Sequence, residues 1–147
     1  MPIPQVSVFL DNHPGSLSQV MSQLDNSKIR IFAISIADAG EFGLVRMITE
    51  DPERAVKLLE QADFNLAKSR KNTEVIAVQI TETNKFSSIT KILGDNGINI
   101  EYAYSSAVHV EGKIALIARV SDVAKAEGIL RGNNITIMSL NEIEHSF

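Results

Sequence analysis

The chain has 147 residues, of which 44% are apolar and 22% are charged, a balance typical of a folded globular protein. Its formal net charge is -4, so the chain lacks the basic surplus that binding to nucleic-acid phosphates requires. The absence of cysteine excludes disulfides, thiolate metal sites and cysteine nucleophiles.

The first half of the chain predicts the order strand, helix, strand, strand, helix, strand. Alternation of apolar and polar residues predicts a strand at 5–10, and apolar residues at helical spacing predict a helix within 14–28. Two further apolar runs around the turn "DAGE" predict a hairpin over 29–49. Asp51 followed by Pro52 predicts the start of a second helix, and a short strand at 64–70 closes the pattern.

The second half repeats this order. We predict strands at 75–80, 98–106, 113–120 and 134–140, a turn at 111–112, and helices within 84–97 and 122–132. Apolar positions recur at fixed spacing: Leu24, Ile29 and Ile31 correspond to residues 69 positions later, and Ala55, Leu58, Leu59, Phe64 and Leu66 to residues 71 positions later. The repeat predicts an α+β fold of two ferredoxin-like βαββαβ units, 1–71 and 72–147, with antiparallel sheets packed side by side.

The predicted strand at 113–120 has apolar side chains on both faces. Ile114, Leu116 and Val120 lie on one face, and Ala115 and Ile117 on the other. Either this is an interior strand that tolerates alanine and one isoleucine on its open face, or the open face is buried in an oligomer. The second explanation predicts a homodimer.

The loop at 12–17, with the sequence N-x-P-G-x-L, joins the first strand to the first helix. This loop, the order of elements and "GINI" at 97–100 together resemble the ACT domain, a small ligand-binding module of amino-acid metabolism. The resemblance covers nearly the whole chain as two tandem copies. It implies a non-catalytic sensor that binds an amino acid, or a similar small carboxylate, between two paired domains and regulates a metabolic enzyme.

The residues of the loop fit such a ligand on physical grounds. Gly15 permits close approach of the backbone, and the N–H groups of Gly15, Ser16 and Leu17 at a helix N-terminus favour a carboxylate. Asn12 offers both a donor and an acceptor, which suits a zwitterion. The structural alternative is that Pro14 and Gly15 only shape the helix start, with Asn12 as its cap.

The two units differ in which part of the ACT pattern they keep. The second unit has "TETNKF" at 81–86 without a Pro-Gly pair, whereas the first unit has Arg30 where the second has Asn99. We therefore expect one intact composite site and a degenerate one formed by 83–86 with Arg30. The predicted ligand-binding residues are Asp11, Asn12, His13, Pro14, Gly15, Ser16 and Leu17 from the first unit, and Asn99, Ile100, Glu101 and Tyr102 from the second.

Other functions find less support in the sequence. His13, His109 and His145 have no nucleophile or carboxylate at a catalytic spacing, so we expect no catalytic residues, and we expect no metal or cofactor. Aromatic residues are 5% of the chain, too few for base stacking as in RNA-recognition modules. No charged signal region or membrane-length apolar run is present, so we expect a cytoplasmic protein that binds no membrane. The remaining alternative is an interaction module that docks on a metabolic enzyme without a small ligand.

Overall fold

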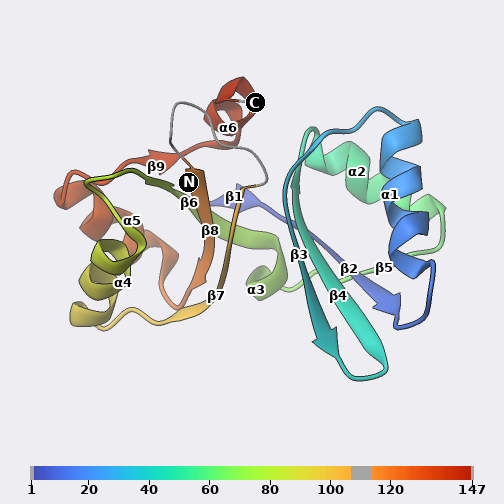
Figure 1. Cartoon of the computed structure of the whole chain (residues 1–147), viewed down its shortest axis with the longest axis horizontal. Helices are drawn as coiled ribbons and strands as arrows, with labels where there is room; N and C mark the ends of the chain where they lie inside the picture. Colours follow the sequence, from blue (N-terminus) through green and yellow to red (C-terminus); the bar gives the residue numbers. More distant parts are fainter. Residues whose placement is uncertain (1, 107–113, 147) are drawn as a thin grey trace. The chain divides into compact units, whose positions relative to one another are not determined.

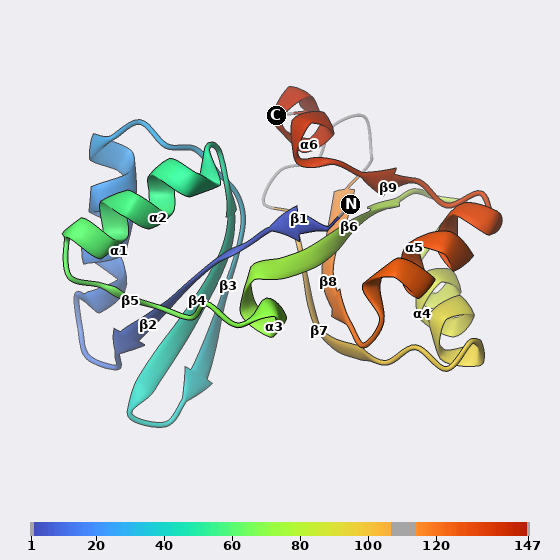
Figure 2. The ribbon, with the colours of Figure 1, turned by 180° about the vertical axis from the view of Figure 1, so that it is seen from behind.

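The computed structural model describes residues 2–106 and 114–146, which form two compact units (Figures 1 and 2). The first unit is Pro4–Thr73, and the second runs from Glu74 onward and includes Ile3. The predicted turn at 111–112 and His109 lie outside the described residues.

The first unit has two helices over one face of an antiparallel sheet (Figure 1). Its sheet has the strand order β3-β4-β2-β5, so the first and third strands of the unit are central. Fully buried side chains from β2, β4 and both helices form its core. The elements are β2 (Val6–Asp11), α1 (Ser16–Asn26), β3 (Ile31–Ala39), β4 (Phe42–Thr49), α2 (Pro52–Gln61), β5 (Asn65–Leu66) and the short α3 (Arg70–Thr73).

The second unit repeats this arrangement with its own core. The order β9-β6-β8-β7 is the same as β5-β2-β4-β3, and the short strand β1 (Ile3–Pro4) also pairs with β6. This topology confirms the predicted ferredoxin-like βαββαβ units. The elements are β6 (Glu74–Ile80), α4 (Phe86–Asp95), β7 (Ile100–Ser105), β8 (Ile114–Val120), α5 (Val123–Gly132), β9 (Ile137–Met138) and α6 (Leu140–Ser146).

The last strand of each unit is shorter than predicted, and a helix follows it. The strand predicted at 64–70 is only β5, after which α3 begins, and the strand predicted at 134–140 is only β9. The residues around His145, after the last predicted strand, form α6. A reciprocal cap explains this start: Ser139 Oγ accepts from Glu142 N at 3.1 Å, and Ser139 N donates to Glu142 Oε1 at 3.3 Å. The Ser-x-x-Glu pattern of this capping box is present in the sequence, so α6 was predictable.

A β-bulge occurs at the same place in both units. The register shifts at Phe32 between β3 and β4, and at Glu101 between β7 and β8. These two residues are 69 positions apart, so the bulge follows the sequence repeat. The residues opposite the bulges are Ile48 and Arg119, which are 71 positions apart. The repeat therefore extends to this irregularity of the backbone. In the second unit the bulge lies at the start of β7, the strand that carries Ile100, Glu101 and Tyr102 of the predicted site.

Strand β8 is buried on both faces, as its apolar pattern predicted. Leu116 and Val120 are buried on the face that carries the core of the unit, and Ala115 and Ile117 are buried on the opposite face. The homodimer that this pattern suggested stays a prediction.

A buried hydroxyl in β4 gives a testable difference between the units. Thr49 is 0% exposed, and within the described part of the chain its Oγ1 has no hydrogen-bond partner. The equivalent residue of the second unit, 71 positions later, is the fully buried Val120. Thr49→Val is expected to raise the free energy of unfolding by about 1–2 kcal/mol, because it removes an unsatisfied polar group from the core.

Urea denaturation checks this expectation. The reverse substitution, Val120→Thr, is the matched control and is expected to lower the free energy of unfolding by a similar amount. A Thr49→Val variant that is no more stable than the wild type would show that the hydroxyl is satisfied in solution.

Candidate functional site

The loop between β2 and α1 turns sharply at Gly15. Gly15 has φ 90°, in the left-handed region, and precedes the first helical residue, Ser16. No side chain caps this helix start, so the alternative that Asn12 serves as its cap is wrong. A Cβ added at Gly15 would meet no atom within 4 Å, which leaves the space beside this backbone open. The glycine is therefore required by its backbone angle and not by crowding.

Asn12 fastens the loop to the turn of the β3–β4 hairpin. Its backbone N–H donates to Glu41 O at 3.1 Å, and its Nδ2 donates to Gly40 O at 3.3 Å. The side-chain oxygen of Asn12 makes no hydrogen bond to any described residue. Asn12 therefore keeps an acceptor while two of its donors hold the loop in place.

His13 and Ser16 form hydrogen bonds within the loop. Ser16 Oγ lies 3.0 Å from His13 Nδ1, and Ser16 N donates to His13 O at 3.3 Å. His13 Nε2 also lies 3.9 Å from the exposed carboxylate of Asp11. Of the three N–H groups predicted to receive a carboxylate, that of Ser16 is thus already used. Those of Gly15 and Leu17 make no hydrogen bond among the described residues.

A pocket of about 250 Å³ lies beside this loop, within the first unit. Three predicted residues, Asp11, His13 and Ser16, line it, whereas Asn12, Pro14, Gly15 and Leu17 do not. Sequence reasoning missed the other lining residues, which come from β2, α1 and the turn from α2 into β5. Those residues are Phe9, Leu10, Gln19, Ala62, Asp63, Phe64 and Asn65.

The missed residues follow from the strand order of the unit. Strand β5 pairs antiparallel with β2, with Phe9 opposite Asn65, so the turn before β5 lies next to the end of β2. Asp63 in that turn has φ 64°, a conformation that aspartate tolerates better than most residues. The predicted βαββαβ order implies that the turn before β5 lies next to the end of β2, but no sequence motif identified the residues of that turn as part of a site.

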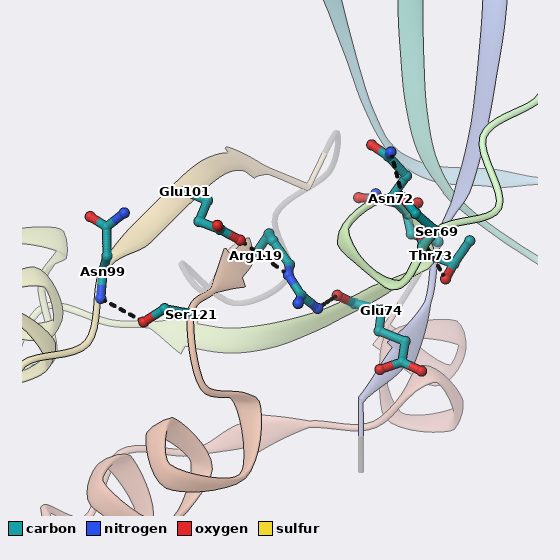
Figure 3. A network of polar contacts seen from close by, with 9 residues as sticks. Ser69, Asn72, Thr73, Glu74, Asn99, Glu101, Arg119 and Ser121 are labelled. Atoms are coloured by element: carbon teal, nitrogen blue, oxygen red, sulfur yellow. Dashed lines mark hydrogen bonds and ion pairs between the residues drawn. The ribbon is translucent and has the colours of Figure 1, made fainter.

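The second predicted half of the site lies at the start of β7, in the second unit. Asn99 N donates to Ser121 Oγ at 3.0 Å, and Ser121 N donates to Asn99 O at 2.9 Å (Figure 3). The side-chain amide of Asn99 is exposed and points away from Ser121 in Figure 3. Within the described chain this side-chain amide has no hydrogen-bond partner. Glu101 pairs with Arg119 at 3.3 Å. Ile100 and Tyr102 are half-buried.

Arg30, at the position equivalent to Asn99, is engaged within its own unit. Its guanidinium donates to Glu50 Oε2 at 3.3 Å and lies 5.2 Å from the centre of the Phe32 ring. Glu50 takes the place of Ser121, 71 positions later, and accepts from Arg30 N at 3.3 Å. The amide of Asn99 is thus available to a ligand in its unit, whereas the cation of Arg30 is bound to neighbours.

The loop at 81–86 also differs from its counterpart in geometry. Thr81 N donates to Asn84 O at 3.1 Å, and Asn84 N donates to Thr81 Oγ1 at 3.0 Å, which closes the turn on itself. Lys85 precedes α4 in an extended conformation, where the first unit has the left-handed Gly15. The left-handed turn is thus present only in the first unit. The pairing of its loop with Asn99–Tyr102 stays a prediction, because the two halves belong to different units.

Neither metal-binding clusters nor membrane-spanning helices are found in the described chain. Within 2–106 and 114–146, no three His, Asp or Glu side chains lie close enough to hold a metal ion. Over the same ranges, every helix is too short or too polar to cross a bilayer. His145 Nδ1 lies 2.7 Å from Asn141 O in the previous turn of α6.

Residues 1–145 match the family described as an ACT domain pair. A solved structure of a protein from Bacteroides thetaiotaomicron has a TM-score of 0.86 at 25% identity, over 97% of this chain and 96% of that chain. The ligand-free regulatory subunit of aspartate kinase from Thermus thermophilus has a TM-score of 0.62 at 17% identity, over 88% of this chain and 89% of that chain. Among curated proteins, none matches the sequence. Because the family match leaves out only the last two residues, the chain belongs to the ACT domain pair family.

Proposed function

We propose that the protein is a non-catalytic sensor that binds an amino acid at the Asp11–Leu17 loop and regulates an enzyme of amino-acid metabolism. The observation that carries this proposal is the open, left-handed turn at Gly15, beside which the N–H groups of Gly15 and Leu17 are unused. Family membership and the likeness in fold to aspartate kinase regulatory subunits support a regulatory role. The proposed setting is the cytoplasm, with the protein acting as a homodimer.

The loop offers partners for both charges of an amino acid. The ligand carboxylate would accept from the N–H groups of Gly15 and Leu17 at the positive end of the α1 dipole. The ammonium group would donate to the side-chain oxygen of Asn12 and to the carboxylate of Asp11. The pocket beside the loop provides further space, and the carboxylate of Asp63 also lines it.

A thermal-shift screen of the twenty common amino acids tests the proposal. A ligand present at one hundred times its dissociation constant is expected to add about 2.7 kcal/mol to the free energy of unfolding, which is readily seen as a higher midpoint. Incubation of the same mixtures followed by mass spectrometry checks for turnover. No shift with any amino acid would contradict the proposed function, and a consumed amino acid would contradict its non-catalytic part.

The asymmetry between the units predicts which side chains matter for binding. Asn12→Ala and Asn99→Ala are each expected to weaken binding by about 1–3 kcal/mol, because each removes a polar contact and leaves ligand groups unsatisfied. Asn84→Ala and Arg30→Ala, at the positions that the degenerate site would use, are the controls and should leave the dissociation constant nearly unchanged.

Calorimetric titration with the amino acid that gives the largest thermal shift measures these effects. If Asn84→Ala weakens binding as much as Asn12→Ala, the two sites are equivalent. If Asn12 matters and Asn99 does not, the ligand is held within the first unit alone, where the pocket lies.

Docking on a metabolic enzyme without a small ligand is the second candidate function. It is favoured by large apolar side chains exposed on the β3–β4 hairpin, since Ile36 is 56% exposed and Phe42 is 50% exposed. The thermal-shift screen separates the two candidates, because docking alone predicts no response to any amino acid.

A further inference from the structure

Arg119 joins three strands of the second unit through one side chain. It lies on β8, opposite the bulge in β7, with only 15% of its side chain exposed. Its Nε donates to Glu101 Oε1 on β7 at 3.3 Å, and its Nη1 donates to Glu74 O at the start of β6 at 2.9 Å (Figure 3). We call Glu101, Arg119 and Glu74 the clasp.

The clasp holds the chain where it passes from one unit to the other. Just before Glu74, within the first unit, Asn72 O accepts from Gln5 Nε2 at 2.9 Å and from Ser7 Oγ at 2.6 Å. Gln5 N donates to Thr73 O at 2.9 Å. The connecting segment, residues 69–74, is therefore fastened to the first sheet up to Thr73, and Arg119 fastens its last carbonyl to the second sheet.

The fold does not require an ion pair at this place. The first unit has the same bulge, but its equivalent residues are Phe32 and Ile48, both buried and apolar. An apolar pair avoids the desolvation cost that an ion pair with a largely buried guanidinium carries. The second unit therefore keeps a charged pair where the same backbone is compatible with an apolar one, and the guanidinium of this pair hydrogen-bonds to Glu74 O at the end of the connecting segment.

We propose that Glu101, acting through Arg119, controls the local stability of residues 69–74, so that a cationic group that draws the Glu101 carboxylate away loosens this segment. Glu101 is suited to receive such a group because 30% of its side chain is exposed, and the hydrogen bond from Arg119 Nε is to its Oε1. Once the carboxylate turns away, the guanidinium loses one of the acceptors that orient it, and its hydrogen bond to Glu74 O weakens. Arg119 is a positioning residue in this scheme.

The cationic group is the ammonium of the bound amino acid, whose third N–H would donate to Glu101 while the other two donate to Asn12 and Asp11. This part of the inference rests on the proposed function. Glu101 lies two residues after Asn99, in the half of the proposed site that the second unit supplies. Binding at that half would thus change the segment between the units, which is what a regulatory module needs in order to report occupancy.

Hydrogen–deuterium exchange of the full chain, read on the peptide that covers residues 69–76, tests the clasp without any ligand. Glu101→Gln is expected to speed exchange of this peptide about fivefold, because a charge-assisted hydrogen bond to the guanidinium is lost. Arg119→Ile places the residue type of Ile48 at the equivalent position, so the unit is expected to fold, and it should speed exchange to a similar extent. Glu50→Gln, which removes the charge from the Arg30 pair of the first unit, is the matched control and should leave this peptide unchanged.

The combined variant separates control through Arg119 from a general loss of stability. In the Arg119→Ile background, Glu101→Gln should have no further effect on the peptide. Unchanged exchange in Glu101→Gln alone, or a fivefold effect that persists in the Arg119→Ile background, would overturn the clasp.

An equimolar mixture of the twenty common amino acids supplies the ligand arm of the same experiment. The mixture is expected to speed exchange at 69–76 in the wild type and not in Glu101→Gln. If the mixture raises the thermal midpoint but does not change the exchange rate of this peptide, binding does not loosen residues 69–74. That result overturns the role of Glu101 in reporting ligand binding and leaves the proposed function in place. A mixture that does not raise the midpoint overturns the proposed function, and the ligand-free variants then decide the clasp by themselves.

Discussion

Leu24→Ala and Leu93→Ala are each expected to lower the free energy of unfolding of one unit by about 2–5 kcal/mol. The two leucines occupy equivalent positions, 69 residues apart, on the first helix of their units. Both are fully buried, but they belong to two separate cores. Truncation leaves a cavity in the core that contained the side chain, so each loss is expected to be local to its unit.

The chain contains its own reporter for this experiment. It has two tyrosines and no tryptophan, and both tyrosines, Tyr102 and Tyr104, lie on β7 of the second unit. Tyrosine fluorescence during urea denaturation therefore follows the second unit, whereas far-ultraviolet circular dichroism follows both. Leu93→Ala should shift the fluorescence midpoint strongly, and Leu24→Ala should shift mainly the circular dichroism. Equal shifts of the fluorescence midpoint in both variants would mean that the units unfold as one.

The fold was predictable from sequence because the residues that show the repeat are buried or partly buried apolar residues of the two cores. Residues such as Leu24 and Leu93 are constrained by the same packing in each unit, so the register of the repeat survives where surface residues differ. The start of α2 was equally clear from the sequence, which predicted it at Asp51 and Pro52. In the structure Asp51 caps this helix, and its side chain accepts from Arg54 N at 3.4 Å. Local rules of this kind act within a few residues and are therefore visible in sequence.

The parts of the site that escaped prediction depend on pairing between distant segments. Asp63 lines the pocket only because β5 pairs with β2, and β5 is too short to show a strand pattern of its own. The residue types predicted that the two units differ at Arg30 and Asn99. They did not predict that Arg30 is held by an ion pair with Glu50. That ion pair requires Glu50, which follows β4, to lie beside Arg30. The Arg119 clasp likewise depends on a bulge that no single strand reveals.

Gly15→Val is expected to abolish amino-acid binding and also to destabilise the first unit. The left-handed backbone at φ 90° is unfavourable for any residue with a Cβ, by about 1–2 kcal/mol, and is worse for a β-branched one. The added side chain would also occupy the open space beside the N–H groups of Gly15 and Leu17, where the ligand carboxylate is proposed to lie. A loss of binding in this variant alone would not separate the two effects.

Gly15→Asn separates backbone strain from obstruction of the ligand. Asparagine adopts the left-handed conformation more readily than other residues with a Cβ, so its urea midpoint should stay closer to that of the wild type. Its side chain still extends into the space that the glycine leaves open, so calorimetric titration is expected to show at least tenfold weaker binding in both variants. Wild-type affinity in Gly15→Asn would show that the ligand does not approach this backbone, and the carboxylate site would then have to lie elsewhere in the pocket lined by Asp11, His13 and Ser16.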